Sequence, residues 1–398
     1  MYKRTLASTN FGNFLMPLVT VLVPLLYTTF MKHYNLNYEM IGRLSLTTFL
    51  TVMIVSLSFG SLVDRFGMKI FIVGGHLFLS GGFILFAFST RIAPNHPYPL
   101  FLLSTVLYSI GGGCMELLLS AIVESIPSDE KAANMSYMHS FFAWGLIVIV
   151  VITTLLMYLF GELYWPYILL FWSLFPLLNA YFLTRSLFPP QALKEHRGSI
   201  TSLLKNRYVV VVMLALLCAG ASEITITQWA STYAEAALQL PKALGNLIGL
   251  SLFALLLGAG RLAYSTWGKR YEMWNVMFVG ALFTLLCYLV TALVSHPMIS
   301  LIACAASGAG IALLWPGSIV LATRHVVNFG AGLFALLGAS GSLGSAVAPW
   351  LVGVLANNAP THVILSPLRI GMLGASFFPL LLIFLLILIK KMDQEQRP

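Results

Sequence analysis

The stretch Gly60-Ser-Leu-Val-Asp-Arg-Phe-Gly-Met-Lys69 is a short charged segment between two long apolar runs. Its glycines allow a tight turn and a close contact between helices. Asp64 can face a helix N-terminus or a cation, while Arg65 and Lys69 place positive charge beside the apolar runs. The stretch therefore predicts a charged turn between two membrane-spanning helices.

The chain around this turn is too apolar for a water-soluble protein. Of its 398 residues, 59% are hydrophobic and 9% are charged, whereas soluble domains carry about 25% charged residues. Its apolar runs are about 20 residues long, which at ~1.5 Å rise per residue spans a ~30 Å hydrocarbon layer. The composition therefore predicts an all-α membrane protein and excludes a soluble enzyme.

Twelve apolar runs divide six and six about the longest internal connection, residues 186–207. This pattern predicts a six-helix half over residues 1–186, a basic linker over 187–207 and a second six-helix half over 208–398. The predicted spans are 11–31, 41–62, 70–89, 99–124, 133–160, 166–185, 208–234, 245–266, 274–294, 298–322, 330–356 and 367–389.

The positions of lysine and arginine predict the orientation in the membrane. With both termini in the cytoplasm, 17 of the 22 basic residues lie on the inner side and 5 on the outer side. The inner group includes Arg4, Arg185 and Arg261. Because cytoplasmic loops carry the excess of basic residues, we expect a multi-pass protein of the cell membrane with both termini inside. The net charge of +9 then reflects topology rather than a nucleic-acid-binding surface.

Glu223 lies well inside the seventh span, after the apolar run 209–218. A carboxylate near mid-membrane costs roughly 2.5–3.5 kcal/mol on insertion scales. At 100° per residue, Glu223 shares one helical face with Gly220, Thr227 and Ser231. An acid on such a face predicts a coupling or substrate site, and the alternative is a structural partner for another polar group.

Glu116 is a second acid well inside a span, on a face of the fourth span that also carries Gly112 and Gly113. It is a candidate for proton or substrate binding, and the alternative is packing against that glycine notch with a hydrogen bond. In the first span, Pro17 and Pro24 each remove a backbone hydrogen bond and predict a bent or broken helix.

The sequence carries no pattern typical of enzymatic chemistry. No P-loop, HExxH or GxSxG motif occurs, and the four cysteines lie in apolar runs without CxxC spacing. We therefore expect no catalytic residue, no metal and no cofactor.

The Gly60–Lys69 stretch resembles the G-x-L-x-D-R-x-G-x-K loop of the major facilitator superfamily, and Gly260-Arg-Leu-Ala-Tyr-Ser-Thr-Trp-Gly-Lys-Arg270 stands at the equivalent place in the second half. The resemblance covers the whole chain. It implies twelve transmembrane helices in two pseudo-repeated halves around a central site. It also implies that the loop is a cytoplasmic gate, the alternative being charges that set topology only. The gate residues are Gly60, Asp64, Arg65, Gly67 and Lys69, with Glu124 near the cytoplasmic end of the fourth span.

Within the superfamily, the chain is most similar to the fucose–galactose–proton symporter branch. The segments Gly220–Tyr233, Met138–Gly145 and Gly308–Pro316, together with Glu116, carry this similarity. The first span departs from it, because residues 11–31 contain no acid where the fucose permease has one. The resemblance therefore implies a proton symporter and leaves the sugar and the pair of acids open.

These observations predict proton-coupled uptake of a small neutral polar solute, such as a sugar, by alternating access. Glu223 or Glu116 would bind the coupling ion, a proton or sodium. The expected partners are this solute, the ion and the lipid bilayer, without nucleic acid, and the expected state is a monomer. The candidates for contact with the solute, each with a packing alternative, are Trp229 and Trp315 for ring stacking, and Thr227, Gln228, Thr20 and Tyr27 for hydrogen bonding.

Two other functions stay open. Proton-driven efflux of an amphipathic compound is one, although Ala143–Val150 of the fifth span lacks the antiporter glycine–proline signature. The other is a receptor or scaffold that binds without transport, which would show no substrate-dependent proton movement.

Overall fold

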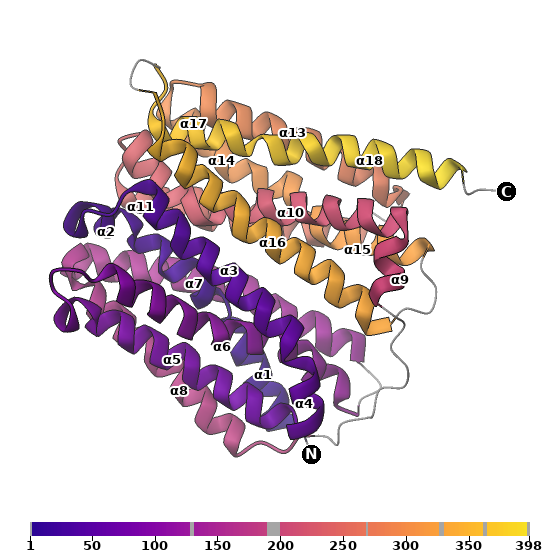
Figure 1. Cartoon of the computed structure of the whole chain (residues 1–398), viewed down its shortest axis with the longest axis horizontal. Coiled ribbons are helices and arrows are strands. Elements are labelled where there is room, and N and C mark those ends of the chain that lie inside the picture. Colours follow the sequence, from indigo (N-terminus) through magenta and orange to yellow (C-terminus); the bar gives the residue numbers. More distant parts are fainter. Residues whose placement is uncertain are drawn as a thin grey trace. The chain divides into compact units, whose positions relative to one another are not determined.

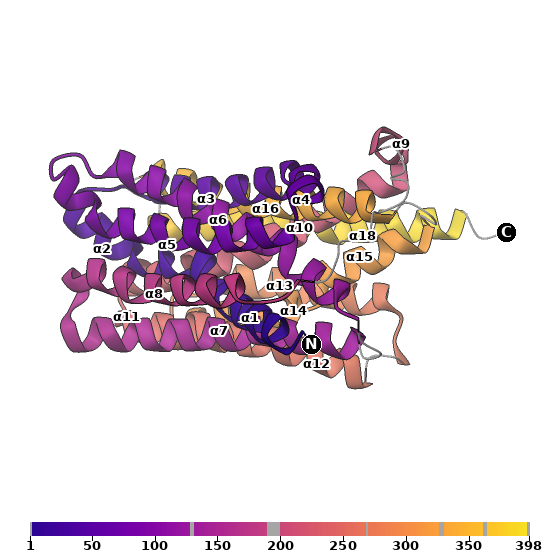
Figure 2. The ribbon, with the colours of Figure 1, turned by 90° about the horizontal axis from the view of Figure 1, so that it is seen from below.

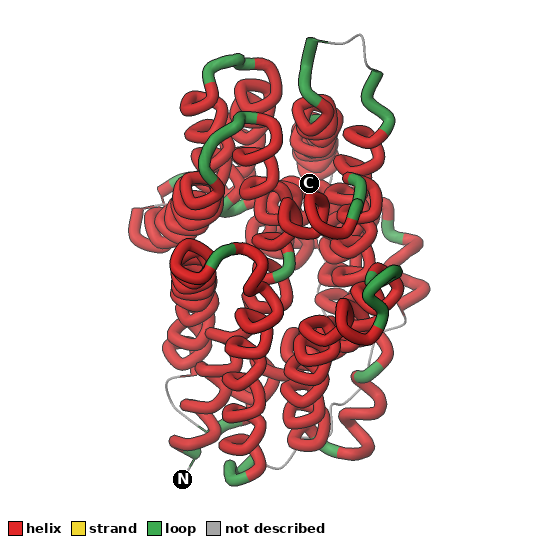
Figure 3. Tube along the Cα trace, turned by 90° about the vertical axis from the view of Figure 1, so that its left-hand side faces the viewer, coloured by secondary structure: helices red, strands yellow, loops and turns green. Residues whose placement is uncertain are grey.

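The computed structural model shows helices joined by short loops, and no strand occurs in the part of the chain that it describes (Figures 1 and 3). The all-α class predicted from the composition is therefore confirmed. The described residues are 2–127, 131–188, 200–267, 270–325, 330–360 and 364–395.

Within these ranges, 12 helices are long and apolar enough to cross a membrane. Their bounds lie close to the predicted runs, except that the first begins at Lys3 instead of residue 11. The polar start of that helix is stable because it packs inside the protein, with Thr5, Ser8 and Thr9 all buried. The chain is therefore a multi-pass integral membrane protein.

The chain separates into two compact units. The first unit is Met1–Asn35 with Thr47–Lys194, and the second is Leu36–Leu46 with Glu195–Pro398. Of the predicted linker 187–207, residues 189–199 lie outside the described part of the chain. Gly268 and Lys269 of the second charged loop lie outside it as well.

In the first unit, α5 packs against both α6 and α8. These contacts are close because small residues face one another: a Cβ added to Gly75 would lie 2.7 Å from the Cβ of Cys114. The helices of this unit are α1 (Lys3–Leu15), η1 (Leu18–Leu22), η2 (Pro24–Leu26), α2 (Tyr27–Tyr34), most of α3 (Tyr38–Ser58), α4 (Gly60–Phe66), α5 (Met68–Ile92), α6 (Tyr98–Ser125), α7 (Lys131–Phe160), η3 (Glu162–Tyr164) and α8 (Trp165–Thr184).

The first span is broken, as its two prolines predict. The α-helical pattern stops at Leu15, a π-helical turn follows Pro17, and a 3₁₀ turn begins at Pro24 before α2 continues. Each proline lacks the N–H that an uninterrupted helix would use, so the backbone changes its hydrogen-bonding pattern at these points.

In the second unit, α10 and α16 run side by side (Figures 1 and 2). The start of α3 also packs here, because a Cβ on Gly42 would lie 3.0 Å from Trp350 Cα. The helices of this unit are α9 (Ile200–Lys205), α10 (Arg207–Thr232), η4 (Tyr233–Ala237), α11 (Lys242–Leu244), η5 (Gly245–Leu252), α12 (Phe253–Trp267), α13 (Met273–Leu293), α14 (Pro297–Ile311), α15 (Leu314–His325), α16 (Gly330–Asn357), α17 (Pro367–Ala375) and α18 (Phe377–Glu395).

The predicted charged turn contains a short helix, α4, which ends at Gly67 with φ 87° and ψ 149°. Lys69 Nζ then donates to the carbonyl of Ser186 at 3.1 Å, which ties the turn to the end of α8 within the first unit. Asp64 and Arg65 are exposed. A Cβ on Gly60 would meet no atom within 4 Å, so the close helix contact expected at this glycine stays a prediction. The gate role of the loop stays a prediction.

The two glycines of this turn should respond differently to alanine. Gly67→Ala should lower the free energy of unfolding by about 1–3 kcal/mol, because only glycine adopts its backbone angles without strain. Gly60→Ala, the matched control, should change it by less than about 0.5 kcal/mol. Denaturant unfolding of the purified protein in detergent measures both, and equal losses would contradict the assignment.

Candidate functional site

The second unit contains an ion pair between two of its transmembrane helices. Glu223 of α10 lies 3.6 Å from Arg261 of α12, measured from Oε2 to Nη2. The Glu223 side chain is 15% exposed and that of Arg261 is 43% exposed. An acid inside a span is therefore compensated by a cation from the neighbouring helix.

Arg261 also contacts a helix break. Its Nε donates to the carbonyl of Ala312 at 3.1 Å, and Ala312 lies between the end of α14 and the start of α15. Gly260 permits this approach, because a Cβ there would lie only 2.7 Å from the Cβ of Ala312. One guanidinium group thus joins α10, α12 and the α14–α15 break.

The sequence pattern does not reveal this role of Arg261. The distribution of basic residues predicts a charge on the inner side for Arg261, and the structure places it within the span Lys242–Thr266. Hydropathy cannot separate the last turns of a span from the loop that follows. The one sequence feature that indicates this role is the Gly260–Arg261 pair, a small residue next to a cation inside the predicted span 245–266.

Trp315 lies directly after the same break, in the first turn of α15. Its ring packs into a slot that two glycines leave open: a Cβ on Gly220 of α10 would lie 2.9 Å from its Cζ3, and Gly341 of α16 faces the same ring. The indole is partly exposed. This packing holds Trp315 beside the helix that carries Glu223, and a stacking role for its exposed part stays a prediction.

The other candidates on α10 are buried. Trp229 is fully buried and its Nε1 donates to the carbonyl of Pro349 at 2.9 Å, so its surroundings favour the packing alternative. Thr227 Oγ1 donates to the carbonyl of Ile224 within its own helix, at 3.0 Å. Gln228 is 2% exposed. Because these side chains are buried, the structure does not show whether a solute contacts them, and such contact stays a prediction.

Glu116 lies in the first unit, on α6, and its side chain is exposed. Among the described residues it forms no hydrogen bond or ion pair. The glycine notch beside it is occupied, since Cβ atoms on Gly112 and Gly113 would meet Val19 and Val55 at 2.8 and 2.7 Å. This arrangement does not favour the alternative in which Glu116 packs into that notch, and both roles of Glu116 stay predictions.

The remaining candidates of the first unit lie apart along its spans. Thr20 Oγ1 donates to the carbonyl of Pro17 at 3.3 Å inside the broken first span, and Tyr27 is 1% exposed. Glu124 is exposed in the last turn of α6.

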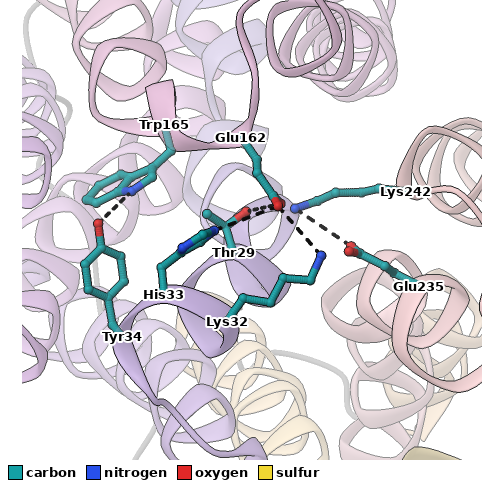
Figure 4. Close-up of polar contacts among 8 residues, drawn as sticks. All are labelled: Thr29, Lys32, His33, Tyr34, Glu162, Trp165, Glu235 and Lys242. Atoms are coloured by element: carbon teal, nitrogen blue, oxygen red, sulfur yellow. Dashed lines mark hydrogen bonds and ion pairs between the residues drawn. The ribbon is translucent and has the colours of Figure 1, made fainter.

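A polar cluster without a sequence signature joins the end of α2 to η3 in the first unit (Figure 4). Glu162 accepts a hydrogen bond from Thr29 at 3.0 Å and lies 3.7 Å from Lys32 and 3.9 Å from His33. No motif indicated it, because the partners are more than 120 residues apart in the sequence. Figure 4 also shows Glu235 and Lys242, which form a 4.0 Å ion pair in the second unit.

The described part of the chain thus has twelve candidate membrane spans, broken helices and a charged pair inside a span, as expected of a helical membrane transport protein. Comparison with known families agrees with this class. The profile of the Major Facilitator Superfamily matches residues 9–349, and the chain belongs to this superfamily of transporters. No curated protein sequence matches the chain.

Solved structures with a similar fold include three transporters. The D-xylose-proton symporter has a TM-score of 0.81 at 13% identity, covering 97% of this chain and 96% of its own. The nucleoside transporter NupG has a TM-score of 0.77 at 13% identity, covering 96% and 98%. The E. coli fucose:proton symporter FucP has a TM-score of 0.65 at 16% identity, covering 98% and 99%. These likenesses confirm the predicted fold.

The close approach of Gly260 to Ala312 allows a direct test of the contact between α12 and the α14–α15 break. Gly260→Ala should lower the free energy of unfolding by about 1–3 kcal/mol, because its methyl group forces α12 away from the break. Gly258→Ala is the matched control in the same helix, since a Cβ there meets no atom within 4 Å. It should be neutral or slightly stabilising. Denaturant unfolding in detergent compares the two, and an equal response would exclude this contact.

A double-mutant cycle tests the ion pair itself. Glu223→Gln and Arg261→Gln should show a coupling energy of about 0.5–3 kcal/mol in unfolding measurements, because the two side chains contact each other. The control cycle pairs Glu223→Gln with Lys390→Gln, since Lys390 lies over the Trp274 ring. Those two changes should be additive within about 0.5 kcal/mol. If the effects of Glu223→Gln and Arg261→Gln on the free energy of unfolding are additive, a direct interaction between the two side chains is excluded.

Proposed function

We propose that this protein is a proton-coupled transporter that takes up a small neutral polar solute, such as a sugar, by alternating access. The observation that carries the proposal is the Glu223–Arg261 pair inside the spans of the second unit. A carboxyl group can gain and lose a proton there, and an ionisable pair within a membrane span is typical of proton pathways. The cell membrane and cytoplasmic termini, expected from the basic residues, belong to the same proposal.

The pair suggests how a proton would act. While Glu223 is charged, it compensates the Arg261 guanidinium, which also donates to the Ala312 carbonyl. Protonation of Glu223 leaves that cation without its carboxylate, so Arg261 gains the capacity to bind another acceptor. The hydroxyl groups of a polar solute are such acceptors. Proton and solute would then favour the same state, which is the requirement for coupling.

The solute class rests on two further points. Trp315 presents a partly exposed indole beside α10, and aromatic faces pack against the apolar face of a sugar ring. Structural neighbours are named for the transport of xylose, fucose and nucleosides, which are neutral and rich in hydroxyl groups.

Glu116 is the second candidate for the proton, because it is exposed in its unit.

Transport in vesicles tests the proposal. The purified protein is reconstituted with a pH-sensitive dye inside, and D-xylose, L-fucose and nucleosides are added outside. We expect one solute to acidify the lumen as it enters. Glu223→Gln should abolish this proton movement while solute exchange continues, because a glutamine side chain cannot carry a proton.

Controls separate the alternatives. Glu235→Gln removes another ion-paired acid of the same unit and should keep proton movement. If only Glu116→Gln abolishes proton movement, the proton site lies in the first unit instead. Alkalinisation of the lumen on solute addition would support efflux, and a protein that binds a solute without moving solute or protons would be a receptor. If no solute moves protons in either direction, the symport proposal fails.

A further inference from the structure

The first unit contains a cavity of about 870 Å³ at the end that carries the N-terminus. It lies between α1 and α8, which pack against each other. Two arginines line it, Arg4 in the first turn of α1 and Arg185 at the end of α8. This cavity is separate from the Glu223–Arg261 pair, which lies in the other unit.

The two arginines have no counter-charge in the described part of the chain. Neither Arg4 nor Arg185 forms an ion pair there, and both side chains are exposed. Arg185 lies over the ring of Tyr181, 5.6 Å from its centroid, so its guanidinium stays at the cavity rim. Two cations at one rim favour a ligand with a phosphate group.

One side chain in the wall of the cavity, Asn179, has an oxygen atom that accepts no hydrogen bond from the described residues. Asn179 is fully buried and lines the cavity. Its Nδ2 donates both hydrogens, to the Ser8 carbonyl at 3.0 Å and to His76 Nε2 at 2.9 Å. The His76 tautomer follows from the network, since Nδ1 donates to the carbonyl of Ile72 at 2.8 Å. Asn179 Oδ1 has no partner, and a buried acceptor of this kind needs a hydrogen-bond donor, which the hydroxyl group of a ligand can supply.

The rest of the lining is apolar. Phe11 and Phe182 line the same cavity, and Phe182 is 46% exposed. The cavity therefore combines cations at its rim, an acceptor in its wall and an aromatic surface. A free anion would use only the first of these features, whereas a phospholipid would use all three.

We propose that this cavity binds an anionic phospholipid with a hydroxylated headgroup. Its phosphate pairs with Arg4 and Arg185, a headgroup hydroxyl donates to Asn179 Oδ1, and an acyl chain lies along Phe11 and Phe182. The basic residues predict that this end faces the cytoplasm, where anionic lipids attract Lys and Arg near the surface. The site goes beyond the proposed transport function and does not depend on it.

Native mass spectrometry of the full chain in detergent tests the site with three lipids of equal acyl chains. Phosphatidylglycerol has the charge and the hydroxyls, phosphatidylethanol has the charge alone, and phosphatidylcholine has no net charge. We expect retention in that order. Arg4→Gln with Arg185→Gln should weaken phosphatidylglycerol binding by about fivefold per arginine and leave phosphatidylcholine unchanged.

Arg91→Gln is the matched control, because it removes one exposed cation at the end of α5 in the same unit. It should leave the lipid preference unchanged. Asn179→Ala should lower phosphatidylglycerol binding to the level of phosphatidylethanol, and thermal unfolding in the same detergent checks that each variant folds. Equal binding of the three lipids, no loss in the double arginine variant, or displacement by millimolar inorganic phosphate would overturn the proposal.

Discussion

Every backbone polar group inside a membrane needs a partner within the protein, and this constraint decides where helices of this chain can break. The second unit breaks a span at Ala312, and the freed carbonyl accepts a hydrogen bond from Arg261. The first unit breaks a span between Pro17 and Pro24, where π and 3₁₀ hydrogen bonds replace the α pattern. One break thus recruits a charged side chain from another helix, while the other is satisfied by its own backbone.

The same constraint explains a buried cation at the far end of the second unit. Arg369 is 8% exposed and donates to the carbonyls of Ala292 and Val294, at 3.2 and 2.6 Å. These carbonyls belong to the end of α13, where no following helical turn supplies donors. Arginine serves in both places because its guanidinium offers five donors on one plane and remains charged.

Much of the fold could be predicted from the sequence, because span length and apolar composition follow directly from the thickness of the bilayer. The break after Pro17 was predictable for a similar local reason, since proline removes a backbone donor. Residue roles at the site were less predictable because they depend on contacts distant in sequence. Trp229 donates to Pro349, 120 residues away, and Gly60 faces open space despite its position in the charged turn. The contacts of Arg261 could not be predicted, because hydropathy does not specify which helix its side chain meets.

The Arg261 side chain has two partners: the carbonyl group at the helix break, which needs a donor, and Glu223, which can be protonated. Its Nε serves the Ala312 carbonyl and its Nη2 faces Glu223, so two separate nitrogens of a rigid plane hold two separate acceptors. Lysine has a single nitrogen and could not hold both in this geometry. Any change in the charge of Glu223 therefore acts on a group that also satisfies the helix break. A proton bound at Glu223 would therefore change the interactions of Arg261 next to the start of α15, where Trp315 packs against Gly220 and Gly341. This connection, rather than the presence of an acid alone, makes the second unit the stronger candidate for coupling.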